Sequence, residues 1–380
     1  MDLTAPRSTI LRALTSAASI APEKASRAIL SHALMVADTK GRVTLTAQQE
    51  APLTYTTSIS AEVKKPGKVC FPARYIASVV KSLPDGDVTL SIAKNGTLSV
   101  ASGKRGVKGI GTMDPDEYPS VLSAEGNAVK IPVSALKTLI KRVFHAASTN
   151  MDGAPHLCSM LLKPSRDSLL AIAMDGATVS RAEVKVGGLT PWQAFNGTCL
   201  LPRVTVEMLS KQLPEVLPVS LTVDERKHVA TFAWDVDGGS EVYTTKLVDG
   251  AYPNWTAAFR SDDIQTETRV DREALLGAAR FAILTGDAVQ LLVTDAGIAV
   301  VTESDDKGKS SESIDATTVA RVEGAVPPDV YCTNGKKLIN ALDALDADEV
   351  IVGLNHDTSP IIVMGAGDES AVTVNAAMRV

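Results

Sequence analysis

The sequence repeats one pattern three times, and this repetition constrains the fold more than any local motif does. Segments with helical spacing begin at Pro72, Pro202 and Asn334, which lie about 130 residues apart. A Tyr-Pro pair recurs at a similar interval, at Tyr118-Pro119 and again at Tyr252-Pro253. A repeat of this length is a domain in its own right and not the short unit of a solenoid. The sequence therefore predicts three similar domains, at residues 1–123, 124–259 and 260–380.

Each third of the chain carries two segments whose apolar residues recur at helical spacing. The six predicted helical segments cover residues 10–18, 76–83, 136–143, 206–213, 275–283 and 338–345. Pro72 and Pro202 are expected in the first helical turn, and Asn334 at the cap. Strands are predicted at apolar or alternating runs such as Arg42–Ala47, Val88–Ile92, Leu169–Ala173, Val289–Val293 and Ile298–Thr302. This mixture predicts an α+β fold of three repeated domains, each with two helices packed on antiparallel sheets.

Composition excludes several classes of protein. A formal net charge of −6 argues against a uniformly basic surface that wraps nucleic acid, although it allows a local basic stripe. The four cysteines have no metal-ligand spacing, and we expect buried core thiols in a reducing compartment at Cys70, Cys158, Cys199 and Cys332. The N-terminus lacks a charged-then-apolar leader, and no apolar run reaches the roughly 18 residues that span a bilayer. We therefore expect a soluble cytoplasmic protein with no membrane contact, no metal and no cofactor.

Basic residues recur on the helix faces opposite the apolar stripes. In the segment after Pro72, Arg74, Ser78 and Lys81 share one such face. The basic residues of the other segments are Lys137, Lys141, Arg203, Arg280, Lys336 and Lys337. A single lysine on a helix face is usually only solvated, but this recurrence is unusual in an acidic protein. It predicts a positive track that contacts phosphates without reading bases.

No short motif predicts catalysis. The basic, glycine-rich stretch Gly103–Gly111 lacks the Gly-Lys-Ser/Thr ending of a phosphate-binding loop, and no apolar helix follows it. It is therefore interpreted as an edge strand or hairpin. The five histidines have no zinc-like spacing, and no nucleophile motif is present. We expect a protein that is not an enzyme.

Nine short segments occur in an order that is typical of one known family. They are Ile29–Leu34, Phe71–Arg74, Leu83–Gly86, Asp116–Pro119, Ala171–Gly176, Leu201–Arg203, Leu247–Trp255, Arg280–Leu284 and Ala377–Val380. Over essentially its whole length the chain resembles the bacterial β sliding clamp, the processivity subunit of DNA polymerase III. The order and spacing of the segments, together with the threefold repeat, make this resemblance specific.

The resemblance implies a ring. Two chains would join head to tail as a homodimer, with helices lining a central hole around double-stranded DNA and sheets forming the outer wall. Such a ring holds DNA independently of its sequence, because base-specific contacts would stop it from sliding. The positions that the resemblance directs toward DNA are Lys24, Arg74, Lys137, Arg203, Arg280, Lys336 and Lys337.

The resemblance also implies an apolar groove that receives short peptides from partner proteins. These partners are the replicative DNA polymerase, the clamp loader, and repair polymerases or ligase-type proteins. The matching positions are Leu157, Met174, Gly176, Val179, Pro253, Met378 and Val380. A pocket of flexible apolar side chains suits hydrophobic anchor residues. The implied function is processive DNA replication.

The chain departs from the family pattern around this groove. The usual Thr-Asp-Gly-His-Arg-Leu reads Met174–Val179, so Ala177 and Thr178 replace the His and the Arg. The usual Met-Pro near the end reads Ala376-Ala377, and the usually basic positions after the second Tyr-Pro are Thr256-Ala257. We expect a groove that is less polar at its rim and prefers a different peptide, in either a main or an auxiliary clamp.

Three other functions stay open from the sequence. A clamp-fold protein that no longer slides could be a peptide-binding or regulatory module, although the retained basic residues argue against this. An enzyme would need a titratable cluster, and the sequence predicts none. A linear ligand-binding protein of three repeated domains would be a monomer, whereas a ring requires a dimer near twice 39.9 kDa.

Overall fold

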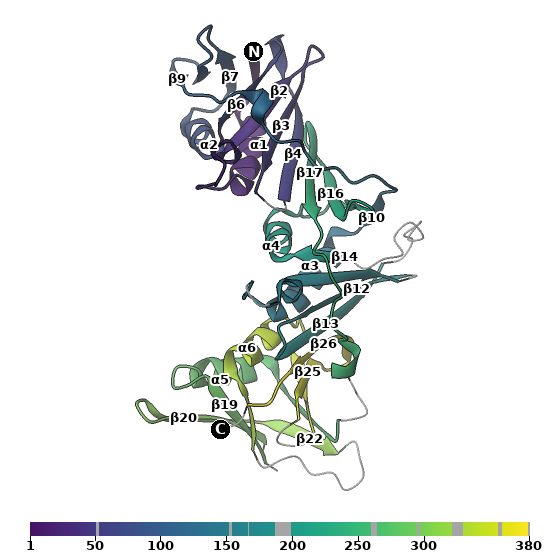
Figure 1. The fold of residues 1–380 in the computed structure, drawn as a ribbon. Helices are drawn as coiled ribbons and strands as arrows, with labels where there is room; N and C mark the ends of the chain where they lie inside the picture. Colours follow the sequence, from purple (N-terminus) through teal and green to yellow (C-terminus); the bar gives the residue numbers. More distant parts are fainter. Residues whose placement is uncertain are drawn as a thin grey trace. The chain divides into compact units, whose positions relative to one another are not determined.

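The computed structural model describes residues 1–50, 53–151, 154–165, 167–186, 199–259, 264–294, 297–320, 330–355 and 359–378. Within these residues six α-helices alternate with β-strands, and the strands pair in antiparallel fashion (Figure 1). This is the α+β architecture that the sequence predicts.

Among the residues that the structure describes, the first and last thirds of the chain share one order of elements: strand, helix, five strands, helix, three strands. In the first third these are β1 (Asp2–Pro6), α1 (Arg7–Ile20), β2 (His32–Ala37), β3 (Arg42–Gln48), β4 (Leu53–Ser60), β5 (Glu62–Lys65), β6 (Gly67–Pro72), α2 (Ala73–Ser82), β7 (Asp87–Ile92), β8 (Leu98–Ser102) and β9 (Arg105–Ile110). In the last third they are β18 (Thr266–Asp271), α5 (Arg272–Ala282), β19 (Ala288–Thr294), β20 (Gly297–Ser304), β21 (Gly308–Ile314), β22 (Ala316–Ala320), β23 (Tyr331–Asn334), α6 (Gly335–Asp343), β24 (Glu349–Leu354), β25 (Ile361–Gly365) and β26 (Asp368–Asn375).

The middle third follows the same order, with one strand fewer before its second helix among the residues described. Its elements are β10 (Val129–Ile131), α3 (Val133–Val143), β11 (Ser159–Pro164), β12 (Ser168–Met174), β13 (Thr178–Lys185), β14 (Cys199–Pro202), α4 (Arg203–Gln212), β15 (Val219–Asp224), β16 (Val229–Val236) and β17 (Gly239–Lys246). The threefold repetition is therefore present in the order of elements, and each predicted helical segment overlaps one helix.

The chain forms two compact units, and the first contains Met1–Val133 and Glu207–Leu247. Its two sheets have the strand orders β5-β1-β7-β8-β9 and β10-β15-β16-β17-β4-β3-β2-β6. Helices α1 and α2 pack against each other, and each contacts strands of both sheets. Their apolar faces, which include Ile10, Leu14 and Ile76, are buried and form the core together with the sheets.

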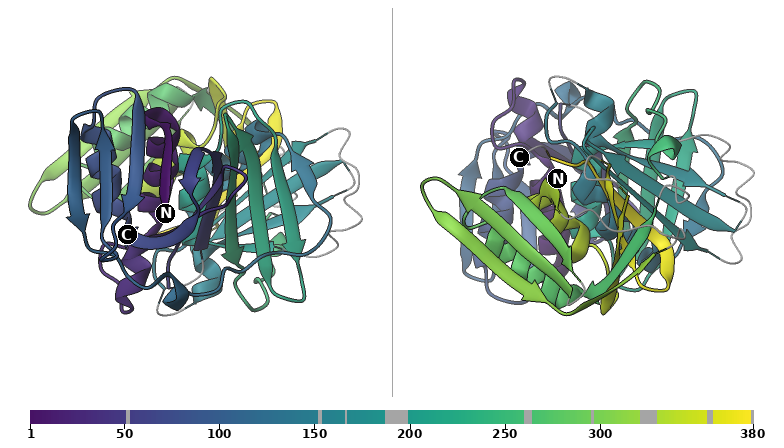
Figure 2. Two further views of the ribbon diagram at one scale, coloured as in Figure 1. Left: turned by 90° about the horizontal axis from the view of Figure 1, so that it is seen from above. Right: turned by 90° about the horizontal axis from the view of Figure 1, so that it is seen from below.

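The second unit contains residues 134–186, 199–206 and 248–378, where the structure describes them. Its larger sheet has the order β14-β11-β12-β13-β26-β25-β24-β18-β22, and its smaller sheet has the order β21-β20-β19-β23. Helices α5 and α6 repeat the arrangement of α1 and α2, because they pack together and each contacts strands of both sheets. In the right-hand view of Figure 2 the smaller sheet (light green) lies over α5.

One pairing rule joins neighbouring repeats within a sheet. The final strand of the middle third, β17, pairs with the fourth strand of the first third, β4, from Gly239↔Ile59 to Thr245↔Leu53. The final strand of the last third, β26, pairs in the same way with the fourth strand of the middle third, β13. Sheets therefore continue across the predicted limits near residues 123 and 259. The division into three domains stays a prediction that rests on the repeat.

Two local interpretations of the sequence are confirmed. Strand β9 lies at the edge of the five-stranded sheet, as expected for the glycine-rich stretch Gly103–Gly111. All four cysteines are buried and free, as expected for core residues.

The starts of the repeated helices differ slightly from the prediction. Pro72 and Pro202 end strands β6 and β14, so they lie one residue before the helices and not in the first turn. Proline is tolerated there because β6 and β14 are edge strands, which pair with a neighbouring strand on one side only. Asn334 caps α6 as predicted, because its side-chain oxygen accepts the N–H of Lys337 at 3.1 Å.

Candidate nucleic-acid interface and peptide groove

Helix α2 presents one of the two predicted cations of the first third. Arg74 is exposed, and its Nε donates to the backbone oxygen of Ala21 at 3.1 Å. Lys24 is exposed three residues after Ala21. The hydrogen bond therefore brings these two predicted cations into one neighbourhood of the first unit.

Helix α3 carries two predicted cations one turn apart. Lys137 and Lys141 are both exposed, and residues four apart lie on one face of a helix. Lys141 forms an ion pair with Asp346, and both side chains are about half exposed. An exposed pair contributes only about 0–1 kcal/mol, so a phosphate group can replace Asp346 at little cost.

The side chain of Arg203, at the start of α4, is held by contacts with backbone oxygens and with an aromatic ring. Its Nη1 donates to the backbone oxygens of Ala147 at 3.2 Å and Ser148 at 3.0 Å. Its guanidinium also lies over the ring of Phe144, 4.9 Å from the ring centroid. These contacts hold Arg203 against the segment that follows α3.

The predicted cations at α5 and α6 have carboxylate partners. Nη2 of Arg280 lies 2.8 and 3.0 Å from the two carboxylate oxygens of Asp343. Nζ of Lys336 lies 3.0 Å from Oδ1 of Asp287. Because each pair is close to neutral as a unit, the last third offers phosphates less positive charge than its basic residues alone suggest.

Lys337 is the least exposed of the predicted lysines. Its Nζ lies 2.7 Å from Oδ2 and 3.0 Å from Oδ1 of Asp175. Asp175 belongs to the turn between β12 and β13, so Lys337 connects α6 to that turn.

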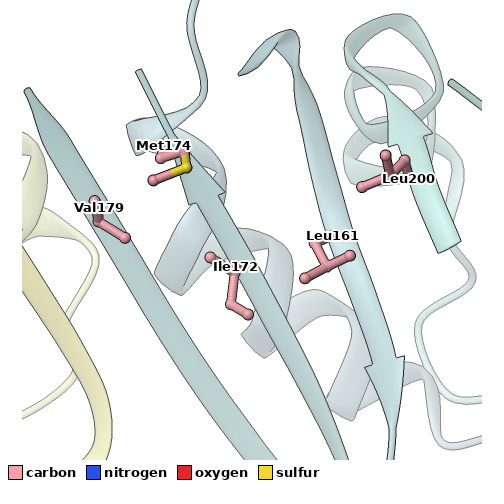
Figure 3. Close-up of a cluster of buried hydrophobic side chains, with 5 residues drawn as sticks. All are labelled: Leu161, Ile172, Met174, Val179 and Leu200. Carbon is pink, nitrogen blue, oxygen red and sulfur yellow. The ribbon is translucent and has the colours of Figure 1, made fainter. Parts of the chain in front are cut away.

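Three predicted groove residues lie together in the second unit, two on its large sheet and one packed against that sheet. Met174 and Val179 belong to a buried apolar cluster, and Leu157 packs against it. The other members of this cluster are Leu161, Ile172 and Leu200 (Figure 3). The five side chains come from four neighbouring strands, β11 to β14. Alternation along each strand explains the shared face, since Ile172 and Met174 are two residues apart.

The segment after β17 covers this apolar cluster. The side chains that pack against it are Val248, Tyr252, Trp255, Ala258 and Phe259. The N–H of Val248 donates to the backbone oxygen of Leu200 at 3.0 Å. Burial raises the pKa of the Tyr252 hydroxyl, so the group is uncharged at neutral pH. Pro253, another predicted groove residue, is partly buried next to Tyr252.

A pocket of about 200 Å³ lies beside the cluster. Its lining includes Ala257, Ala258, Ile264, Asn355, Pro360 and Ile362. Ala258 belongs to both the pocket lining and the cover of the cluster, so the pocket adjoins the cluster. Oδ1 of Asn355 is buried and has no hydrogen-bond partner among the described residues. It can accept an N–H from a bound chain, which would remove the cost of a buried unpaired acceptor.

Most of the pocket lining was not predicted from the sequence, although one signal was available. Strand β25 contains the uninterrupted apolar run Ile361–Met364, and all of its residues are buried. A strand that is apolar on both faces is covered on both faces. This run could have extended the predicted groove to Ile362.

The remaining predicted groove residues lie outside the cluster. Gly176 is in the β12–β13 turn with φ of +92°, a conformation that favours glycine. Met378 is partly buried, and its N–H donates to the backbone oxygen of Cys332 at 2.8 Å. Val380 falls outside the described residues.

The two residues that depart from the family pattern in the turn make internal contacts. The N–H groups of Ala177 and Thr178 donate to Oδ1 of Asp175 at 2.9 and 2.7 Å. The Thr178 hydroxyl donates to Oδ1 of Asn375 at 2.9 Å, and the backbone oxygen of Ala177 accepts the N–H of Ala376 at 2.8 Å. Thr178 is buried on the face opposite the apolar cluster, where it ties the turn to the C-terminal strand.

Two negative observations concern the described parts of the chain. No group of three or more His, Cys, Asp or Glu side chains there could hold a metal ion. None of the described helices combines the length and apolar character needed to cross a membrane.

Solved structures match the fold along the whole chain. The DNA polymerase sliding clamp from Bacillus subtilis superimposes with a TM-score of 0.90 at 22% identity, covering 100% of this chain and 99% of that chain. The sliding clamp from Bartonella birtlesii bound to griselimycin gives a TM-score of 0.89 at 22% identity and covers 100% of both chains. The chain therefore has the fold of these DNA polymerase sliding clamps.

Comparison of the sequence with known families and proteins points to the same group of proteins. A family model described as DNA polymerase III beta subunit, N-terminal domain, matches residues 1–122. The beta sliding clamp of Synechococcus elongatus is 27% identical over 358 residues, covering 91% of this chain and 90% of that protein. Together with the fold, these matches support the interpretation of the chain as a divergent bacterial β sliding clamp.

Proposed function

We propose that this chain is a DNA sliding clamp, in which two copies close a ring around double-stranded DNA and tether the replicative DNA polymerase for processive synthesis. The observation that carries the proposal is the pairing rule that joins the repeats. Two pairs of strands satisfy the rule within one chain. The third pair of strands that the rule predicts is left unpaired in one chain and would pair with a second copy.

The third instance involves β9 and β21. These are the final strand of the first third and the fourth strand of the last third, and each lies at the edge of its sheet. Two chains arranged head to tail would pair β9 of each copy with β21 of the other. A head-to-tail contact produces a closed ring when the rotation between subunits closes. Three proposed domains from each copy would give a ring of six.

The charges at the two edges favour this contact. Lys104, Arg105 and Lys108 are exposed on and beside β9. The β20–β21 hairpin exposes four acidic and two basic residues, which are Glu303, Asp305, Asp306, Glu312, Lys307 and Lys309. Opposite net charges on two edges that are otherwise unpaired guide strand pairing in one orientation.

The ring would hold DNA through phosphate contacts alone. The residues that we assign to this surface are Lys24, Arg74, Lys137, Lys141, Arg203, Arg280 and Lys336. Attraction of this kind depends on salt and not on base sequence, which lets a ring slide. The chain would itself catalyse no reaction and would act in the cytoplasm, where a bacterial polymerase works.

We assign the apolar cluster and the adjoining pocket to partner peptides from the replicative polymerase, the clamp loader, and repair polymerases or ligase-type proteins. The residues carried over from the family are Leu157, Met174, Gly176, Val179, Pro253, Met378 and Val380. The apolar floor, the cover from residues 248–259 and the unpaired acceptor of Asn355 support a ligand with apolar anchors and free backbone N–H groups.

Electron microscopy and sedimentation test the ring directly. At micromolar concentration we expect six-lobed rings with an open centre and a mass near twice 39.9 kDa. Single arcs with the mass of one chain would contradict the dimer and favour a peptide-binding module that does not slide.

A topological assay tests sliding itself. The protein is loaded onto nicked circular DNA by the clamp loader of the same cell, washed with salt, and the circle is then cut with a restriction enzyme. We expect retention on the circle and release from the linear product, because a sliding ring leaves by a free end. Equal retention on both forms would contradict encirclement.

A further inference from the structure

Lys337 differs from its neighbour Lys336, although the sequence directs both toward DNA. The Lys336 side chain is 65% exposed and its partner Asp287 is 59% exposed. The Lys337 side chain is only 27% exposed and its partner Asp175 is 26% exposed. Both carboxylate oxygens of Asp175 lie within hydrogen-bond distance of the Lys337 Nζ. A phosphate would have to break this sheltered pair before it could bind Lys337.

Asp175 organises the turn that connects two strands of the groove floor. Its Oδ1 accepts the N–H groups of Ala177 and Thr178 as well as the Lys337 ammonium. Met174 precedes the turn and Val179 follows it, and both side chains belong to the apolar cluster. The position of the carboxylate therefore affects the position of two groove side chains.

The remaining charged surroundings leave Lys337 as the cation that balances Asp175. His145 interacts electrostatically with the carboxylate, but burial lowers its pKa to about 4, so its ring is neutral at neutral pH. Within the described residues, Lys337 is the group that forms an ion pair with Asp175. Removing one partner of a sheltered pair leaves the other charge without compensation, which is more disruptive than losing an exposed pair.

We propose that Lys337 is a positioning residue of the peptide groove and not a DNA contact, because its ion pair with Asp175 fastens the β12–β13 turn to helix α6. The inference rests on the proposed function of the groove. It assigns different roles to two adjacent lysines. Lys336 contacts DNA, and Lys337 positions the groove that binds the partner peptide.

The first test compares Lys337→Met with the matched control Lys336→Met in the full-length protein. Calorimetry measures binding of griselimycin, and fluorescence anisotropy at low salt measures binding of a short DNA duplex. For Lys337→Met we expect griselimycin affinity to fall about five- to tenfold, with DNA affinity changed less than about twofold. Lys336→Met should show the opposite pattern. Loss of DNA binding with unchanged griselimycin binding in Lys337→Met would overturn the proposal.

Two further variants separate positioning from general damage. Asp175→Asn keeps the oxygen that accepts the two N–H groups but loses the charge, so it should weaken griselimycin binding as Lys337→Met does. The double variant should be no weaker than either single one, since both remove the same pair. Lys337→Arg keeps the ion pair and should bind like the parent protein. Additive losses, or a loss in Lys337→Arg equal to that in Lys337→Met, would contradict the proposal.

Hydrogen exchange at the amides of Ala177 and Thr178 provides a readout that needs no ligand. Exchange should accelerate at these two amides in Lys337→Met and remain unchanged in Lys336→Met. If the parent protein does not bind griselimycin but the acceleration is seen, the proposed groove fails while the fastening role of Lys337 stands. If exchange is unchanged, the fastening role fails, whatever the parent protein binds.

Discussion

The β4–β17 junction within the chain and the proposed β9–β21 junction between copies follow one pairing rule but differ in the side chains that they carry. At the β4–β17 junction, Tyr55 and Tyr243 lie with ring centroids 4.9 Å apart, and Trp234 stacks on Tyr243 at 5.0 Å. Strands β9 and β21, which we propose to pair between copies, carry glycine, serine and charged residues in their place. The β4–β17 junction, which is the internal junction compared from here on, is filled by large aromatic rings, whereas the proposed external one depends on backbone pairing and charge.

The difference indicates how one fold can supply both a permanent and a reversible joint. Burial of aromatic rings makes opening of the internal junction costly. An edge rich in glycine and charge gains less from burial, so a proposed ring can open there to admit DNA while the rest of each chain stays folded.

The largest expected effect comes from breaking the internal junction. Tyr243 is fully buried, and its hydroxyl donates to Glu241 at 3.2 Å. Tyr243→Ala should lower the free energy of unfolding by about 3–5 kcal/mol, because a large cavity and an unpaired acceptor remain. Urea denaturation followed by circular dichroism measures this. The half-exposed Tyr75 provides the control, and an equal loss in Tyr75→Ala would remove the distinction between the sites.

The second effect is on the proposed external junction. Reversing Arg105 and Lys108 to Glu should weaken the dimer about tenfold or more, since like charges would then face each other across the β9–β21 contact. Sedimentation velocity over a concentration series gives the dimer affinity. The matched control reverses Lys64 and Lys65 on β5, at the other edge of the same sheet. A dimer weakened equally by both changes would place the contact elsewhere.

A third and smaller effect is a pH dependence at the internal junction. Glu241 is 4% exposed, and burial raises the pKa of its carboxyl, with Arg12 Nε 3.5 Å away. The folded state therefore holds this proton more tightly than the unfolded state does. Its contribution to stability is present at low pH and is lost as pH rises through the raised pKa.

Glu241→Gln should flatten that part of the pH profile of unfolding free energy. Glu312→Gln on the exposed strand β21 should leave the profile as it is in the parent protein. Denaturation midpoints measured across the acidic and neutral range provide the comparison, and an unchanged slope in Glu241→Gln would refute the assignment.

The smallest effect concerns how DNA attraction is shared between the two units. Asp343→Asn should free Arg280 and raise duplex affinity at low salt by about two- to fivefold, the scale expected for an exposed ion pair. Arg74→Ala in the first unit should lower affinity and reduce the salt slope by about one for each phosphate that the variant no longer neutralises. Anisotropy titrations at several salt concentrations test both, with the exposed Glu62→Gln on β5 as control. No gain in Asp343→Asn would mean that Asp343 does not compete with phosphate.

The local features of the fold were accessible from the sequence because they depend on near neighbours. Helical spacing of apolar residues located the six α-helices found in the described parts of the chain, and the glycine-rich stretch around Lys104 indicated an edge strand. Capping by Asn334 was also predictable, since it requires only the residues of one helical turn.

The candidate site could be predicted only in part from the sequence. Leu157, Met174 and Val179 were found through the family resemblance, and they do lie together. The pocket residues Ile264 and Asn355 come from distant segments that carry no shared motif. The turn residue Thr178 was expected to alter the groove rim, but strand alternation buries it on the opposite face.

The sequence by itself determined the threefold repeat, the order of elements and the residues that can carry charge, because periodicity and residue type act over short distances. Only the tertiary structure decided which strands became neighbours, as in the pairing of β17 with β4, and which cations are balanced by carboxylates, as for Lys337 and Asp175. Those outcomes depend on which surfaces meet when segments more than a hundred residues apart pack together, and no local pattern encodes that meeting.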